Sequence, residues 1–97
     1  MAYKLEIRNE VKINIFDGFK WYEDKRKGLG REFIYAVEAL INYIENYPEH
    51  FQIKYRGRYR EAVLKRFPYV IIYEIIQDTV IVFEVFPTKA DPTKKLK

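Results

Sequence analysis

The chain has 97 residues, of which 48% are hydrophobic, and this length predicts one domain with a single core. It has no cysteine, which excludes a disulfide framework and thiolate metal ligands. The formal net charge is +4, and it is uneven: residues 1–50 carry 8 Lys/Arg against 9 Asp/Glu, whereas residues 51–97 carry 10 against 5. A basic second half suggests an acidic partner, either nucleic acid or peptide, and ordinary solubilising charge explains it as well.

The N-terminal residues show no apolar run followed by a cleavage site. The chain also lacks a window of about 18 uncharged apolar residues, the length that a membrane-spanning helix needs. We therefore expect a cytoplasmic protein without a membrane partner.

The chain begins with a strand and a helix. Apolar and charged residues alternate from Tyr3 to Ile7, which is typical of a half-buried strand. Asn9 is the expected N-cap of a helix of about four turns, whose apolar stripe runs from Val11 to Tyr22. The aromatic pair Trp21-Tyr22 is expected to anchor this helix on a sheet.

A second helix follows after a short break. The segment Gly28-Leu29-Gly30 is expected to end the first helix, because glycine adopts the left-handed C-cap conformation readily. An apolar stripe then runs from Phe33 to Tyr47, and Pro48 ends the helix. A short connection between two amphipathic helices predicts an antiparallel helical hairpin.

The remaining elements are strands, expected over Phe51–Tyr55, from Tyr59 to about Lys65, and over Tyr69–Ile76 and Thr79–Phe86. The last two form a hairpin through Gln77-Asp78. We predict an α+β fold, an N-terminal strand and a two-helix hairpin packed on a four- to five-stranded, mostly antiparallel sheet. The neighbour of the first strand stays open. The domain is expected to span residues 1–92, followed by a basic tail over 93–97.

Few residues are candidates for chemistry. His50 is the only histidine and the chain has no serine, so a Ser-His-Asp arrangement is excluded and no metal site is expected. No glycine-rich loop resembles a phosphate-binding loop, since Gly28-Leu29-Gly30 is better explained as a helix break, and we expect no cofactor.

The strongest functional signal is a basic cluster interleaved with Tyr55 and Tyr59. Its members, which we take as candidate target-binding residues, are Lys54, Arg56, Arg58, Arg60, Lys65 and Arg66. Cations beside aromatic rings suit phosphate contact and base stacking. A solvated strand edge whose charges prevent aggregation explains the same residues.

Strict alternation along the third strand places Arg58, Arg60, Ala62, Leu64 and Arg66 on one face. If helices cover that face, Arg60 needs a carboxylate or carbonyl partner.

Several motifs together resemble the RelE/ParE toxin superfamily. They are W-Y-E at 21–23, G-L-G at 28–30 with Phe33 after it, Pro48 before an aromatic strand, and R-E-A-V-L-K-R-F-P-Y-V-I-I-Y-E-I from residue 60. The resemblance runs from Leu5 to Pro92. It implies a toxin of a type II toxin–antitoxin pair, with the same two-helix hairpin on an antiparallel sheet.

The resemblance also implies one of two activities, mRNA cleavage in the ribosomal A site or inhibition of DNA gyrase. The lysine positions of RelE-type nucleases correspond to Glu61 and Val63 here, and an arginine position corresponds to Val70. After the last strand, Pro87 and Ala90 occupy two positions that are polar in many relatives. RNA cleavage needs cations that stabilise a charged phosphorane, so these departures favour the ParE-like side.

Our leading hypothesis is therefore a plasmid-stabilisation toxin that inhibits its target by binding, with Arg60, Arg58 and Lys65 as its cationic face. The resemblance implies a cognate antitoxin as partner, and either a homodimer or a toxin–antitoxin hetero-oligomer. Two alternatives remain: an mRNA interferase with candidate catalytic residues Arg60, Lys65 and Lys89, or a degenerate, non-toxic member that keeps antitoxin binding.

Overall fold

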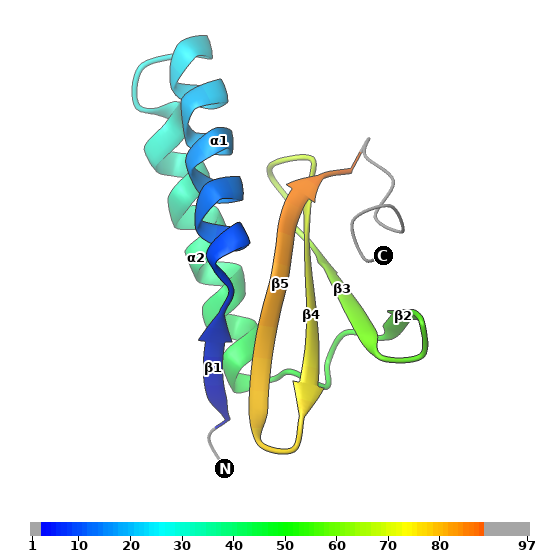
Figure 1. Cartoon of the computed structure of the whole chain (residues 1–97). Coiled ribbons are helices and arrows are strands. Elements are labelled where there is room, and N and C mark those ends of the chain that lie inside the picture. The colour runs from blue at the N-terminus through cyan, green and yellow to red at the C-terminus, as the bar shows by residue number, and fades with distance from the viewer. Residues whose placement is uncertain (1–2, 89–97) are drawn as a thin grey trace.

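The computed structural model describes residues 3–88, which form two layers: a five-stranded sheet and a pair of helices on one of its faces (Figure 1). The elements follow in the order β1 (Lys4–Ile7), α1 (Asn9–Lys25), α2 (Leu29–Asn46), β2 (Ile53–Tyr55), β3 (Tyr59–Val63), β4 (Tyr69–Ile76) and β5 (Thr79–Pro87). This order confirms the predicted α+β fold. The expected tail over 93–97 lies outside the described residues.

The start of α1 differs from the prediction. The residue before the helix is Arg8, in an extended conformation and without a side-chain capping bond, and Asn9 is already helical. The backbone N–H of Arg8 donates to the carbonyl of Val82 at 3.2 Å, which holds Arg8 extended beside β5. The helix therefore begins at Asn9, and the expectation that Asn9 is the N-cap was wrong.

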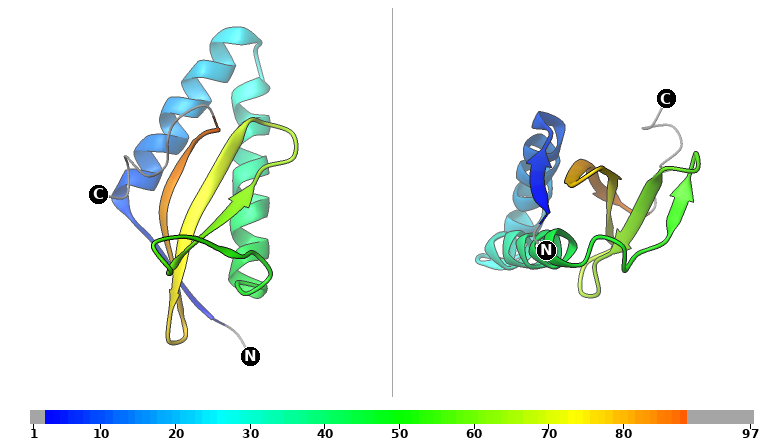
Figure 2. Two further views of the ribbon diagram at one scale, coloured as in Figure 1. Left: turned by 90° about the vertical axis from the view of Figure 1, so that its right-hand side faces the viewer. Right: turned by 90° about the horizontal axis from the view of Figure 1, so that it is seen from below.

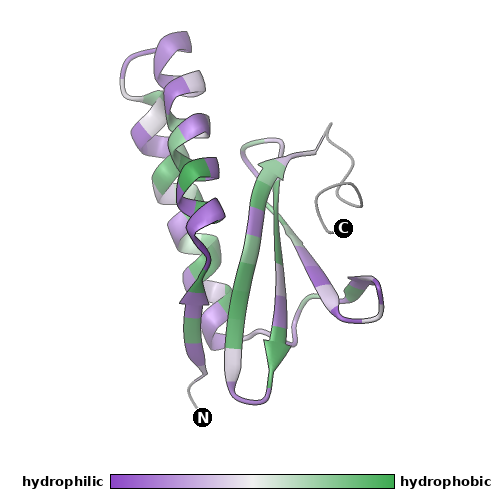
Figure 3. Cartoon of the chain, viewed as in Figure 1, coloured by the Kyte–Doolittle hydropathy of each residue, from purple (hydrophilic) through white to green (hydrophobic). Residues whose placement is uncertain are grey.

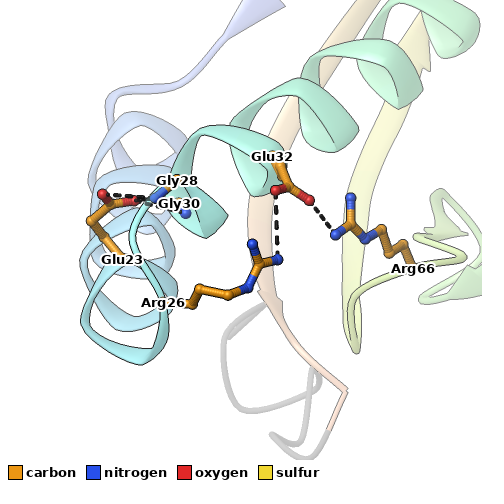
Figure 4. A network of polar contacts seen from close by, with 6 residues as sticks. All are labelled: Glu23, Arg26, Gly28, Gly30, Glu32 and Arg66. Carbon is orange, nitrogen blue, oxygen red and sulfur yellow. Dashed lines mark hydrogen bonds and ion pairs between the residues drawn. The ribbon is translucent and has the colours of Figure 1, made fainter.

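The two glycines between the helices have different roles. Gly28 has a φ of 89°, the left-handed conformation that glycine adopts without a steric penalty. Gly30 lies inside the first turn of α2, where an added Cβ would be 2.7 Å from the backbone oxygen of Phe19. The carboxylate of Glu23 accepts hydrogen bonds from the N–H groups of both glycines at 3.0–3.1 Å (Figure 4). The C-cap of α1 is Arg26 in an extended conformation, so the expected glycine C-cap was wrong. Gly28 is instead the N-cap of α2, and Gly30 lets the helices approach closely.

Of the predicted aromatic anchor, only Tyr22 packs toward the sheet. Its ring lies 5.2 Å from that of Phe33 and 4.8 Å from that of Phe67. Trp21 is 58% exposed, and its ring lies beneath the ammonium group of Lys25. The prediction was therefore right for one member of the pair.

The strand order in the sheet is β1-β5-β4-β3-β2. β1 pairs with β5 in parallel, with Leu5 opposite Val80, and the other neighbours are antiparallel. This placement answers the question that the sequence left open. Two further views show both helices on one side of the sheet and the β2–β3 turn far from α1 (Figure 2).

Each face of the sheet carries its own apolar cluster. The cluster on the helix side is the larger one and includes Phe33, Ile71 and Tyr73. The opposite face carries a smaller cluster of Tyr59, Val70, Ile72 and Phe86, with Tyr55 and Phe83 packed against it. Hydrophobic residues dominate β4 and β5, whereas the turn between β2 and β3 is hydrophilic (Figure 3).

Candidate functional site

The predicted cationic residues lie in two places, the β2–β3 hairpin and the end of β3. The hairpin carries Lys54, Arg56 and Arg58, and Arg60 follows within β3. Lys65 and Arg66 lie beyond β3, which ends at Val63 rather than at Lys65 as expected. The six residues therefore do not form one continuous strand face.

Arg60 shares a face with Ala62 and Leu64, as the alternation along β3 predicted. The structure shows that helices cover this face, because Ala62 and Leu64 are in the helix-side core. Its Nη1 donates to the carbonyl oxygen of Phe51 at 2.6 Å and to that of Glu49 at 3.5 Å. These are the carbonyl partners that a covered arginine requires. Arg60 thereby ties β3 to the loop after α2.

Arg58 lies on the opposite face, so its predicted placement beside Arg60 was wrong. It precedes β3 and belongs to the turn, where strand alternation does not apply. Its Nε and Nη2 each donate to the carboxylate of Glu74 at 3.0 Å, and this bond raises the pKa of Arg58. Glu74 is only 4% exposed, so its charge needs this bidentate partner.

Glu61 occupies one of the positions where the family resemblance implied a lysine. Its carboxylate accepts a hydrogen bond from Lys54 Nζ at 2.6 Å and another from the Tyr55 hydroxyl at 2.7 Å. Burial and the bond to Glu61 raise the pKa of Tyr55, and the bond to Glu61 raises that of Lys54. The position thus carries a carboxylate that already holds a cation.

An open groove of about 580 Å³ separates α2 from the outer edge of β3. Its lining is mostly apolar and includes Leu40, Tyr43 and Val63, with Lys65 and Arg66 also at its wall. Val63 is 53% exposed. We refer to this feature as the α2–β3 groove.

The edge of β3 at this groove presents free backbone. β2 pairs only with the first residues of β3, through Ile53 opposite Arg60 and Tyr55 opposite Tyr59. The N–H of Leu64 donates to the carbonyl of Tyr69, so Leu64 points its peptide groups toward β4. Peptide groups alternate in direction along an antiparallel strand, and those of Val63 therefore point outward.

The far end of the α2–β3 groove is fixed by ion pairs. Arg66 pairs with Glu32 on α2, and Arg26 pairs with the same carboxylate at 3.5 Å (Figure 4). Arg66 also lies over the Phe67 ring, 5.1 Å from its centroid. Within the described residues, Arg56 and Lys65 are the members of the predicted cluster that lack such a partner.

The candidate catalytic set of Arg60, Lys65 and Lys89 stays a prediction, because the described residues include only its first two members. Arg60 is bound to backbone carbonyls on the helix side, whereas Lys65 lies at the wall of the α2–β3 groove. Lys89 and Ala90 lie outside the described residues. Pro87 is the exposed last residue of β5.

Sequence reasoning missed Glu74 as the partner of Arg58. A signal was present, because Glu74 is the lone charged residue in the apolar run Tyr69–Ile76. A carboxylate in such a strand requires a cation or hydrogen-bond donors. The α2–β3 groove was also missed, since it depends on where β2 stops pairing.

Among residues 3–88, no group of three or more His, Cys, Asp or Glu side chains is placed to hold a metal ion. No helix in the same part of the chain has the length and apolarity to cross a membrane.

One family model matches most of the chain. The model of the family described as ParE toxin of type II toxin–antitoxin system, parDE, matches residues 5–92. A search of the curated proteins found no match.

Two solved structures have a similar fold. One is a chain of the chromosomal ParDE system from P. aeruginosa, with a TM-score of 0.69, 9% identity, and coverage of 89% of this chain and 96% of that one. The other is a mutant of the E. coli toxin RelE in the free state, with a TM-score of 0.60, 15% identity, and coverage of 97% and 92%.

Proposed function

Because the chain belongs to the ParE toxin family of type II toxin–antitoxin systems, we propose that it arrests growth by binding its target without cutting RNA. The target class we propose is DNA gyrase, and the site of action is the cytoplasm. The observation that carries the proposal is that three of the predicted cations are already hydrogen-bonded to acceptors within the fold. Lys54, Arg58 and Arg60 each already bind a carboxylate or a carbonyl within the fold.

This engagement bears directly on RNA cleavage. A cleavage site needs cations free to stabilise the charge that develops on the phosphorane, and loss of one such group costs about a hundredfold in rate. Glu61 and Val63 stand at the two lysine positions, and Glu61 further neutralises Lys54. The described residues therefore supply little charge for this chemistry, which supports inhibition by binding.

We further propose that the cognate antitoxin binds in the α2–β3 groove. The groove offers apolar walls, outward peptide groups at Val63 and the unpaired cation Lys65. An acidic segment that adds a strand to β3 and places apolar side chains against Leu40 and Tyr43 would use all three features. A disordered segment that folds on binding can cover such a surface, at the cost of the entropy lost when it becomes ordered.

The proposed function is tested by tightly induced expression in a bacterial host. We expect growth to stop, and growth to resume when a cognate antitoxin, sought in the neighbouring reading frame, is co-expressed. Normal growth with the folded protein present would contradict the toxin role and favour a degenerate member. The mass of the purified toxin alone would show whether it forms a homodimer, and the mass of its mixture with the antitoxin would show whether a hetero-oligomer forms.

The second candidate function is a ribosome-dependent mRNA interferase, which the fold shared with the RelE mutant keeps under consideration. Arg60, Lys65 and Lys89 would be its catalytic residues. Codon-phased cuts in transcripts distinguish it from an inhibitor of gyrase.

A further inference from the structure

The turn between β2 and β3 holds an arginine in a conformation that arginine rarely adopts. Arg56 has a φ of 52° and Gly57 a φ of 67°, and the N–H of Arg58 donates to the carbonyl of Tyr55 at 3.1 Å. Positive φ at both central residues defines a type I′ turn, whose first position favours Asn, Asp or Gly. An arginine there is strained, and strain of this kind concentrates at functional sites.

The side chain of Arg56 gains nothing from the fold that would offset this strain. Arg56 is exposed, and it makes no ion pair, hydrogen bond or ring contact with any residue that the structure describes. Its guanidinium is therefore free to bind a group from another molecule.

Side-chain hydrogen bonds to two carboxylates of the sheet hold the residues on either side of Arg56. Tyr55 and Lys54 both bind Glu61, and Arg58 binds Glu74 with two hydrogen bonds. The side chain of Arg58 nevertheless stays 55% exposed, because it uses only Nε and Nη2 toward Glu74. The side chain of Lys54 is 57% exposed. These bonds order the residues on either side of Arg56, which lowers the entropy cost of binding at the turn.

The residues around the turn favour a carboxylate-bearing partner over a nucleic acid. Lys54 lies 5.6 Å from the Tyr55 ring centroid and Arg58 4.9 Å from that of Tyr59, so each ring carries a cation of its own. Base stacking needs open aromatic faces, which these rings do not offer. Glu61 and Glu74 also neutralise two of the three cations, and nucleic-acid affinity depends on the number of phosphates that free cations neutralise.

We infer that Arg56, supported by Lys54 and Arg58, binds a carboxylate-bearing segment of a protein partner. An unpaired guanidinium on a turn whose neighbouring side chains are bonded to the sheet suits a bidentate carboxylate contact. The inference rests on the proposed function only in taking this partner to be the target of the toxin. The α2–β3 groove, with its antitoxin, is a separate surface.

The test uses the whole chain and two labelled probes of equal charge, a polyglutamate peptide and an oligothymidylate. We compare wild type with Arg56→Asn, which fits the turn, and with Lys27→Asn, which removes the same charge from the distant α1–α2 turn. Fluorescence anisotropy should show about a tenfold loss of polyglutamate affinity for Arg56→Asn and little change for Lys27→Asn. Equal losses would mean that only net charge matters, and would overturn the inference.

Two further readouts make the outcome unambiguous. Arg56→Asn should raise Tm by about 4 °C because the strain is relieved, and an unchanged or lower Tm would contradict the argument from strain. Tighter binding of oligothymidylate than of polyglutamate, weakened by the same variant, would assign the turn to nucleic acid instead.

Growth arrest separates this inference from the proposed function. If wild type and Arg56→Asn arrest growth equally, the toxin role stands and the inference fails. If wild type causes no arrest, the toxin role fails, and the polyglutamate assay still decides whether the turn binds carboxylates.

Discussion

Two arginine residues that the sequence offered as target-binding residues are hydrogen-bonded within the fold. Arg60 donates to two backbone carbonyls, and Arg58 donates to a nearly buried carboxylate. A cation with such partners has fewer donors left for a substrate or a target. At the scale of single residues, the structure therefore distinguishes cations that are bonded within the fold, such as Arg58 and Arg60, from Arg56 and Lys65, which have no such partner among the described residues.

For Arg60, a structural role and a role in toxicity predict different results. Removal of the side chain in Arg60→Ala leaves the carbonyl of Phe51 without its donor, and we expect a loss of about 1–2 kcal/mol in the free energy of unfolding. Urea unfolding measures this loss, with Arg56→Ala as the control that removes a charge without a partner. Unchanged stability together with weakened growth arrest would instead make Arg60 part of the functional surface.

Tyr73 gives the fold a dependence on high pH. Burial raises its pKa to about 12, and its hydroxyl donates to the carbonyl of Pro48 at 2.6 Å. Because the folded pKa exceeds the unfolded value of 10.0, the stabilisation is complete below pH 10 and is lost as pH rises toward 12.

The expected slope for Tyr73 is about 1.4 kcal/mol per pH unit within that window. Other tyrosines with a raised pKa contribute as well, so the readout is the difference between wild type and Tyr73→Phe in unfolding experiments across the window. At neutral pH the free energy of unfolding of Tyr73→Phe should be about 1 kcal/mol lower than that of wild type, because the hydrogen bond is lost. This difference between the two proteins should disappear as the pH rises above 10. Parallel curves for the two proteins would contradict the assignment.

At the scale of elements, close packing of the two helices depends on Gly30. An alanine at this position would favour the helix by about 1 kcal/mol in isolation. Its Cβ would, however, lie 2.7 Å from the Phe19 carbonyl oxygen and 2.9 Å from Glu23 Oε1. We expect Gly30→Ala to destabilise the protein by about 1–3 kcal/mol, measured by urea unfolding, because backbone cannot move aside as a flexible side chain does. A gain in stability would show that the helices have room to separate.

If the antitoxin binds in the α2–β3 groove, a charge placed in that groove should weaken its binding. Val63→Asp places a charge among its apolar walls, and we expect antitoxin affinity to fall about tenfold or more, measured with the purified pair. Ile76→Asp is the matched control, because Ile76 is 46% exposed at the end of β4 and does not line the groove. Equal affinities for the two variants would place the antitoxin elsewhere.

Most elements were predictable because their signals are local. Apolar periodicity located both helices and the β4–β5 hairpin, and strand alternation placed Arg60 on the same face as Ala62 and Leu64. Alternation failed for Arg58 because it lies in a turn. The pairing of β1 was not predictable, since a period of two reveals which face is buried but not which strand is the neighbour.

The candidate site was less predictable than the fold. The pair Arg58–Glu74 joins residues 16 positions apart, and the α2–β3 groove exists only where β2 ends its pairing with β3. Such features depend on how elements meet in space. The sequence nevertheless carried a usable hint in Glu74, a lone carboxylate in an apolar strand.

For the whole molecule, we propose that this member of the ParE toxin family arrests growth by binding its target, because Lys54, Arg58 and Arg60 are already bonded within the fold. The measurement that tests this most directly is a map of transcript 5′ ends in cells arrested by the induced protein. We predict growth arrest with no codon-phased cuts above those of uninduced cells. Phased cuts that appear with arrest, and disappear when the antitoxin is co-expressed, would contradict the account and make the protein a nuclease.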